Sequence, residues 1–382
     1  MKLFQFKEAF SVNRNYGLDV LRTAAILLVI FCHGTVLLPD FLVSRLLAKW
    51  TGYVGVELFF VLSGYLIGNI LLKLLTEESV GASFSSLIGG FWIRRWFRTL
   101  PNYYLFLLIQ IALVVSDASG WSHWWHYLGS YWRYFWFGQN LFWPMGDLMA
   151  VSWSLTIEEW FYLSFPLLIA LFAWRLGRSV KAYFLTTLTY IILFTSLRVL
   201  MACVEYFNGN EHLAGVVGVR LDAIAYGALM MLGMKVWPSI MRRQRWWFMG
   251  LGLVGLTGAC LLFNYELDHG LPPVLMASLI TLTSLSLALL LPVAVYQTES
   301  SGMSKLRSAI AGISIISYSV YLLHSLVIYR VIPRWFDHGT WYYHYILYWI
   351  LSLFLSFLVY TLFERRMTAC REHFSRKRQD EP

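Results

Sequence analysis

Two residues of the first long apolar stretch, Arg22 and His33, have side chains that could do chemistry together in the sequence GLDVLRTAAILLVIFCHG. In a helix of about 100° and about 1.5 Å per residue, positions eleven apart share one face and lie roughly 16 Å apart along the axis. An ionisable group inside a membrane is costly unless it is paired or hydrated, so each one marks a candidate functional site. Histidine can take a proton from a hydroxyl near neutral pH, and a carboxylate can orient it and support its charged form.

Carboxylates occur in two further apolar stretches. Glu57 lies in GVELFFVLSGYLIG, where Gly64 and Gly68 share its helical face and would let another helix or a ligand come close. Glu158 lies in SWSLTIEEWFYL, and its neighbour Glu159 is rotated from it by about 100°. Glu57 and Glu158 are therefore the candidate carboxylate partners of a histidine.

Two more stretches carry polar side chains near one end. Arg220 and Asp222 lie in VRLDAIAYG and could form a structural ion pair or contact a substrate. Ser317, Tyr321 and His324 share one helical face in ISYSVYLLH. A single histidine of this kind can also be a hydrogen-bonded packing residue, so both interpretations stay open.

A cluster of arginines precedes the third apolar stretch in FWIRRWFRTLP. Arg94, Arg95 and Arg98 fall within five residues and are followed by Pro101. Arginine suits two-point contacts with phosphate. The alternative is a simple topology signal, because basic residues also mark the cytoplasmic ends of membrane helices.

The chain that carries these residues has 382 residues, of which 58% are hydrophobic and 13% charged. Soluble domains carry about 25% charged residues, so lipid must be the solvent for much of this chain. The net charge of +9 comes from short basic runs between apolar stretches, a pattern typical of membrane topology and not of nucleic-acid binding. The four cysteines are far apart and indicate neither a disulfide framework nor a metal site.

Ten apolar stretches approach the length of about 20 residues that a helix needs to cross a bilayer. They are residues 18–38, 53–75, 99–116, 153–174, 183–203, 216–237, 247–264, 271–295, 310–332 and 342–363. We therefore expect an all-α, polytopic transmembrane helix bundle over residues 17–364, between an N-terminal segment 1–16 and a basic tail 365–382. With ten helices, every basic cluster falls on one side, which predicts that both termini are cytoplasmic.

This topology also sorts the ionisable residues by side. The predicted outer set is His33, Glu57, Glu158, Arg220, Asp222 and His324, and the predicted inner set is Arg22, Arg94, Arg95 and Arg98. Two outer regions, 117–152 and 204–215, are expected to choose the acceptor. The first is rich in tryptophan and predicts an interfacial helix, a re-entrant segment or a plain aromatic belt.

Taken together, the motifs resemble the acyltransferase-3 family, the integral-membrane O-acyltransferases that modify bacterial surface polysaccharides and related acceptors. The resemblance covers the whole chain, and the motifs occur in the family's order. They are Arg22 with His33 eleven positions on, GVELFFVLSGYLIG, RRWFRTLP, SWSLTIEEWFYL, VRLDAIAYG and SYSVYLLH.

The resemblance implies an enzyme of the bacterial cytoplasmic membrane that moves an acyl group, often acetyl, from cytoplasmic acyl-coenzyme A to a hydroxyl at the outer face. It implies that Arg22, Arg94, Arg95 and Arg98 bind the coenzyme A phosphates and that no metal is needed. His33 would be the essential histidine, and Glu158 matches the acidic position of the family's tryptophan–serine–leucine motif. We expect the other polar positions to contact the acceptor, namely Glu159, Arg220, Asp222, Tyr321 and His324.

Several points stay open at this stage. The rise from Arg22 to His33 is comparable to an extended pantetheine arm, so a thioester could be presented near His33. His33 could act as a base, which we favour, or be acylated itself. The acceptor could be a polysaccharide, a glucan, peptidoglycan, a glycolipid or a small metabolite. A transporter or flippase, and a lipid-linked glycosyltransferase, are the alternative functions.

Overall fold

The computed structural model describes residues 14–39, 45–76, 84–117, 124–142, 148–204, 215–269, 271–297, 304–336 and 338–370. Nearly all of these residues are helical, and no strand occurs among them. Within these ranges, nine helices are long and apolar enough to cross a membrane. The predicted polytopic helix bundle is thereby confirmed. Most of the segment 1–16, most of the tail 365–382, Trp121, Trp143 and most of 204–215 lie outside the described residues.

The long helices follow the predicted stretches. They are α2 (Tyr16–Gly34), α3 (Arg45–Thr76), α4 (Phe84–Asp117), α6 (Ser152–Leu176), α7 (Val180–Cys203), α11 (Arg245–His269), α12 (Pro273–Ala288) with α13 (Leu291–Val295), α14 (Ser304–Leu326) and α16 (Trp341–Val359). Shorter elements connect or extend them: η1 (Thr35–Leu37), α5 (Trp124–Phe135), η3 (Val217–Val219), α9 (Asp222–Val236), α10 (Pro238–Arg243), η4 (Val327–Val331), α15 (Ile332–Trp335) and η5 (Tyr360–Glu364).

The sixth predicted stretch, 216–237, differs from the expectation. Its first residues form the short turn η3, and the helix α9 that follows has 15 residues, fewer than the about 20 needed to cross a bilayer. Eleven of the residues of α9 are buried, so this helix lies inside the bundle. Its apolar character is explained by packing against other helices.

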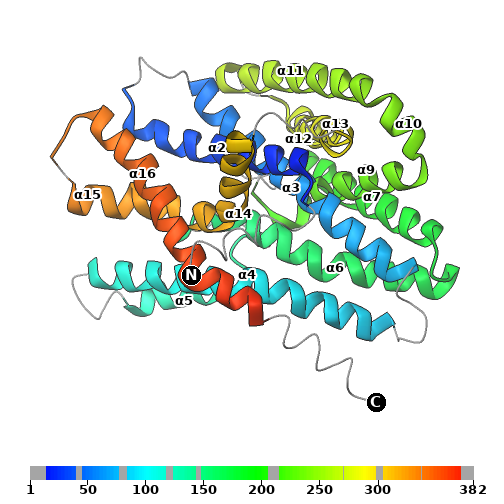
Figure 1. The fold of residues 1–382 in the computed structure, drawn as a ribbon, viewed down its shortest axis with the longest axis horizontal. Helices are drawn as coiled ribbons and strands as arrows, with labels where there is room; N and C mark the ends of the chain where they lie inside the picture. Colours follow the sequence, from blue (N-terminus) through cyan, green and yellow to red (C-terminus); the bar gives the residue numbers. More distant parts are fainter. Residues whose placement is uncertain are drawn as a thin grey trace.

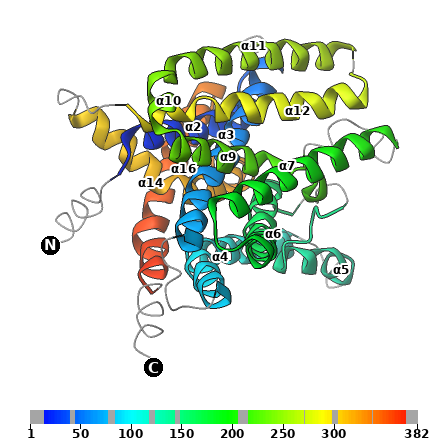
Figure 2. The same cartoon turned by 90° about the vertical axis from the view of Figure 1, so that its right-hand side faces the viewer.

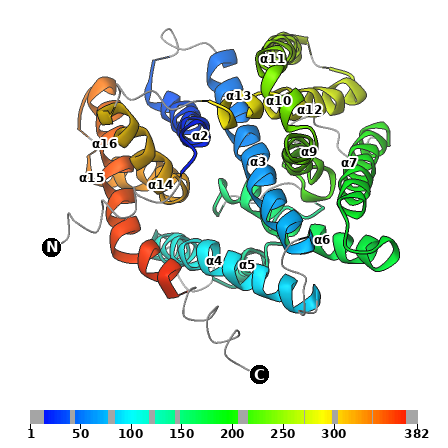
Figure 3. The same ribbon diagram turned by 45° about the vertical axis from the view of Figure 1, so that its right-hand side comes forward.

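Helix α3 runs through the middle of the bundle, with α2 on one side and α9 on the other (Figure 3). Helices α14 and α16 pack beyond α2, and α11 lies side by side with α12 at one edge (Figures 1 and 2). Helices α4, α5 and α6 cover the opposite edge. The elements that carry Arg22, Glu57 and His324 therefore meet around α3 and α2.

The contact between α3 and α9 depends on glycine. A Cβ on Gly64 would overlap the carbonyl of Ile224, and one on Gly227 would overlap the carbonyl of Val61. Gly68, one turn further along α3, lies beside Ala228 of α9 and the hydroxyl of Tyr183. This confirms the prediction that the small residues of this face admit another helix, and that helix is α9.

The tryptophan-rich segment forms a short helix, α5, that lies along α4. The Tyr103 and Tyr104 hydroxyls donate to the carbonyls of Tyr134 and Phe135, each at 2.8 Å. Trp132 stays 54% exposed. The segment is thus anchored by α4 while it presents aromatic surface outward.

Candidate functional site

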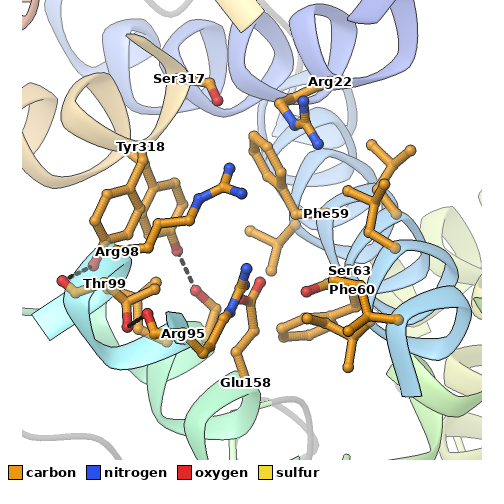
Figure 4. A pocket seen from close by; sticks show the side chains of 18 of the residues that line it. Arg22, Phe59, Phe60, Ser63, Arg95, Arg98, Thr99, Glu158, Ser317 and Tyr318 are labelled. Atoms are coloured by element: carbon orange, nitrogen blue, oxygen red, sulfur yellow. Dashed lines mark hydrogen bonds and ion pairs between the residues drawn. The ribbon is translucent and has the colours of Figure 1, made fainter. Parts of the chain in front are cut away.

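A cavity of about 280 Å³ opens between α2, α3, α4, α6 and α14. Its charged and hydroxyl-bearing lining residues are Arg22, Ser63, Arg95, Arg98, Thr99, Ser154, Glu158, Ser317, Tyr318 and Tyr321. Figure 4 shows Arg22, Arg95 and Arg98 pointing into the same space, with Glu158 beside Arg95. Three guanidinium groups and one carboxylate leave the cavity positively charged, which suits an anionic ligand.

The helix that carries the arginines begins earlier than expected. The sequence predicts a helix over 99–116 after a basic loop, but α4 begins at Phe84 and contains Pro101. Arg95 and Arg98 are one helical turn apart, so both reach the cavity. Arg94 is turned away and its guanidinium lies against Gly90. Of the four predicted phosphate-binding arginines, the structure therefore brings three together.

Arg95 is held by a hydrogen-bonded group at the cavity wall. Its Nη2 lies 3.5 Å from Glu158 Oε2 and donates to the hydroxyl of Tyr162. The Tyr162 hydroxyl donates in turn to Glu158 Oε2 at 2.5 Å and also contacts Ser63. The ring of Tyr162 lies 4.2 Å from the guanidinium carbon. The charge of Arg95 is therefore partly compensated within the protein.

Arg22 is less tightly held. Its Nη1 lies 3.7 Å from Asp19 Oδ1 and 3.3 Å from the hydroxyl of Ser314. Asp19 is bound more closely by Arg14, at 2.5 Å and 3.0 Å, and accepts a hydrogen bond from Ser314 at 2.7 Å. Arg14 therefore compensates most of the negative charge of Asp19, which leaves Arg22 able to bind an anion in the cavity.

Two further carboxylates surround α4 without lining the cavity. Glu159 accepts a hydrogen bond from Thr99 at 2.8 Å. Glu364 accepts from Asn102 at 2.8 Å and from Ser319 at 2.5 Å. These bonds connect α4 to α6, α14 and η5, close to the arginines, so they help to fix the position of Arg95 and Arg98.

His33 lies at the far end of α2 from Arg22. Its Nδ1 is 2.9 Å from the carbonyl of Val29, and its ring centroid is 4.7 Å from that of His324. Neither histidine lines the cavity. Tyr321 lines the cavity and its ring centroid lies 5.9 Å from that of His324. The structure therefore places the histidine pair next to one wall of the arginine-lined cavity.

Tyr321 is fixed at that wall by its hydroxyl. The hydroxyl donates to the carbonyl of Val151 at 2.9 Å and lies 2.5 Å from the hydroxyl of Ser154. Its ring also meets Phe59 edge to face, at 6.1 Å between centroids. Tyr321 and Phe59 therefore pack together in the cavity wall, and Tyr321 lies next to His324.

The prediction that Glu57 or Glu158 is the carboxylate partner of His33 is wrong. Among the described residues, neither Glu57 nor Glu158 contacts it. Gly55 faces the carbonyl of Ala25 in α2, and Glu57 is about 200° further round α3, so it points away from α2. Glu57 instead pairs with Arg220 and accepts a hydrogen bond from Ser284 at 2.6 Å. Glu158 points into the cavity, and this places a predicted outer carboxylate beside a predicted inner arginine.

The proposed ion pair between Arg220 and Asp222 is also wrong. Arg220 pairs with Glu57, and Asp222 pairs with Arg198, which was not among the predicted site residues. Arg198 stands inside the apolar stretch 183–203, so the rule applied to the other intramembrane charges would have found it. Asp19, inside the stretch 18–38, carried the same signal, whereas Glu364 directly follows the stretch 342–363. All four paired residues are almost completely buried.

Comparison with known proteins identifies related proteins and a family. A family model for an acyltransferase domain, acyltransferase-3, matches residues 15–365. A protein of Staphylococcus aureus (strain COL), named as a candidate O-acetyltransferase, is 29% identical over 239 residues, which are 58% of this chain and 35% of that protein. No solved structure matches this chain.

Two relatives carry more specific names. A candidate peptidoglycan O-acetyltransferase of Bacillus subtilis is 33% identical over 170 residues, 40% of this chain and 23% of that protein. The peptidoglycan O-acetyltransferase OatA of Listeria monocytogenes is 31% identical over 185 residues, 44% of this chain and 26% of that protein. The matched regions are thus about a quarter to a third of the length of these curated relatives.

Proposed function

Because the chain belongs to the acyltransferase-3 family, we propose that it transfers an acyl group, acetyl in the first instance, from acyl-coenzyme A to a hydroxyl of a cell-envelope acceptor. The observation that carries this proposal is the arginine-lined cavity whose wall at Tyr321 adjoins His33 and His324. The bacterial cytoplasmic membrane would then hold the enzyme. The donor would enter from the cytoplasm and the acceptor would be modified at the outer face.

Coenzyme A would be held by its phosphates. Arg22 and Arg98 face the cavity and would contact the phosphates directly. Arg95 would contact them as well once a phosphate competes with Glu158 for its guanidinium. From the arginines, the pantetheine arm would run along α2, whose rise from Arg22 to His33 is roughly 16 Å. The thioester would then have to pass the wall formed by Phe59 and Tyr321 to reach the histidines.

The chemistry would use His33 as a base. Its Nδ1 faces the Val29 carbonyl, which can only accept, so Nδ1 carries the hydrogen and Nε2 keeps its lone pair. Nε2 would take the proton of the acceptor hydroxyl while the oxygen attacks the thioester carbon. The carbon–sulfur bond then breaks, and the leaving thiolate takes up the proton. The products are the acyl ester and free coenzyme A.

The acceptor is proposed from the named relatives. Two of them are named for peptidoglycan O-acetylation, so glycan strands with free hydroxyls are the first acceptors to test. Arg220 and Asp222 are engaged in buried ion pairs, and they would shape the acceptor side without contacting the substrate. A polysaccharide or a glycolipid would present the same hydroxyl chemistry.

The test is acyl transfer by the purified protein in proteoliposomes. Acetyl-coenzyme A labelled in the acetyl group is supplied with soluble peptidoglycan fragments, and the ester product is identified by mass spectrometry. His33→Ala is expected to abolish transfer. His344→Ala is the matched control, because His344 also hydrogen-bonds a backbone carbonyl but at the start of α16. Normal transfer by a folded His33→Ala variant would contradict the proposed mechanism.

A further inference from the structure

His33 and His324 form a pair of imidazoles, and no carboxylate contacts either ring in the part of the chain that the structure describes. The ring centroids are 4.7 Å apart and the ring planes meet at 70°. At this separation the edge of one ring lies against the other, with no room for another side chain between them. The rings come from α2 and α14, which pack together.

Both histidines carry a hydrogen on Nδ1. His324 Nδ1 lies 3.1 Å from the carbonyl of Val320, just as His33 Nδ1 faces Val29. A carbonyl only accepts, so Nδ1 is the donor in each ring and each Nε2 keeps a lone pair. In its neutral form the pair therefore offers two proton acceptors, one on each Nε2.

The Nε2 atom of His324 is the more unusual of the two. His324 is completely buried, and within the described residues its Nε2 has no hydrogen-bond partner. A buried acceptor without a partner costs free energy, which a structure normally avoids. The nearest ring that can gain a proton during the proposed reaction is His33.

We infer that His324 is a second proton acceptor in the proposed transfer, so that His33 and His324 together carry the single proton that the acceptor hydroxyl gives up. This inference rests on the proposed function. The hydroxyl O–H bond breaks, its proton bonds to one of the two Nε2 atoms, and the oxygen forms the ester bond. The carbon–sulfur bond breaks, and the proton passes to the thiolate, so the pair ends neutral.

A second imidazole suits this position better than a carboxylate would. Before the reaction a carboxylate would be a permanent charge that needs a counter-ion inside the bundle, whereas neutral His324 needs none. Two protons on the pair would place like charges in contact, which limits the pair to one proton. The pair therefore acts as one acid–base unit.

The test compares two substitutions at position 324. His324→Phe keeps a ring of similar size without nitrogen, and His324→Gln keeps an acceptor. Turnover and donor KM are measured in the proteoliposome assay between about pH 5 and pH 9, the range in which histidine changes charge. His324→Phe is expected to lower kcat about 100-fold, a typical contribution of acid–base groups, with donor KM within about twofold. The acidic limb of its pH profile should move, and His324→Gln should recover part of the rate.

Controls separate this role from packing. Calorimetric binding of coenzyme A identifies the folded variants, because the arginine cavity does not include His324. The double variant His33→Ala with His324→Phe should be no slower than His33→Ala alone, as expected for residues that act as a unit. His344→Gln is the matched histidine control and should keep wild-type kinetics.

Three results would overturn the inference. The first is a folded His324→Phe variant with wild-type kcat. The second is an equal loss in the Phe and Gln variants with an unmoved pH profile, which would indicate packing alone. The third is a wild-type protein that binds no donor and transfers no acyl group. In that case the proposed function fails as well. Donor binding and acyl transfer by the wild-type protein distinguish this outcome from failure of the inference alone.

Discussion

Arg198 and Asp222 are joined at two points, with Nη1 2.7 Å from Oδ1 and Nη2 2.7 Å from Oδ2. The pair is buried, and its further hydrogen bonds include those to the carbonyl of Val219 at 2.8 Å and the hydroxyl of Thr281 at 2.5 Å. One ion pair therefore ties α7 to η3, α9 and α12. Its neighbour, the pair of Glu57 and Arg220, ties α3 to the same region.

Removal of one partner of this pair should be costly. Arg198→Leu leaves Asp222 as a buried charge without its cation, so we expect a loss of about 3–5 kcal/mol in the free energy of unfolding. Reversible unfolding in detergent measures it, with exposed Arg243→Leu as control. The double variant Arg198→Leu with Asp222→Leu should lose less than the sum of the two single variants. A loss below about 1 kcal/mol for Arg198→Leu would show that this pair does not hold the helices together.

The glycine contact between α3 and α9 gives a second prediction. In an exposed helix, alanine in place of glycine stabilises by about 1 kcal/mol. Gly64→Ala should instead destabilise by about 1–3 kcal/mol, because the new methyl group would overlap the Ile224 carbonyl. Gly258 in α11 is the matched control, since nothing lies within contact distance of its Cβ position. The two substitutions should therefore change the melting temperature in opposite directions, and a shared direction would contradict the close approach.

The length and periodicity of the apolar stretches were enough to predict most of the helices. Nine stretches became long helices because each holds enough apolar residues to cross a bilayer. Periodicity also predicted that Gly64 and Gly68 share a contact face. It could not predict which neighbour each face meets, because that depends on how separate helices pack. Glu57 shows the limit: its face was predictable, but its partner Arg220 was not.

Among the site residues too, residue type predicts some features and helix packing decides the others. Arg22, Arg95 and Arg98 were predictable as a group from residue type, and the cavity brings them together. Arg94 was grouped with them because it belongs to the same basic cluster, which was expected to lie in a loop. Inside a helix, a rotation of about 100° between neighbours separates Arg94 from Arg95. The contact of His33 with His324 joins residues that are far apart in sequence, so no local pattern could predict it.

The arginines should differ in their effect on donor binding. Arg22→Gln removes a cavity-lining charge, so we expect the coenzyme A Kd to rise about 10-fold or more, the value of one charged hydrogen bond of about 1.5–3 kcal/mol. Arg94→Gln is the matched control on the same protein, because Arg94 lies against Gly90 and not in the cavity. Its Kd should stay within about twofold. Calorimetry at two salt concentrations measures both, and equal losses would mean that the cavity is not the phosphate site.

The last prediction concerns Glu158, which faces Arg95 across the cavity wall. Glu158→Gln keeps the shape of the side chain and an acceptor for Tyr162 but removes the charge that competes for Arg95. Arg95 then becomes available to a donor phosphate, so we expect the coenzyme A Kd to fall about fivefold, the value of an ion pair of about 1 kcal/mol. Adding Arg95→Gln to this variant should cancel the gain, because the freed cation is then absent. The measurement is calorimetric binding of coenzyme A, followed by turnover in proteoliposomes. If the Kd stays constant in Glu158→Gln while kcat falls sharply, Glu158 acts on the reacting groups and not on Arg95.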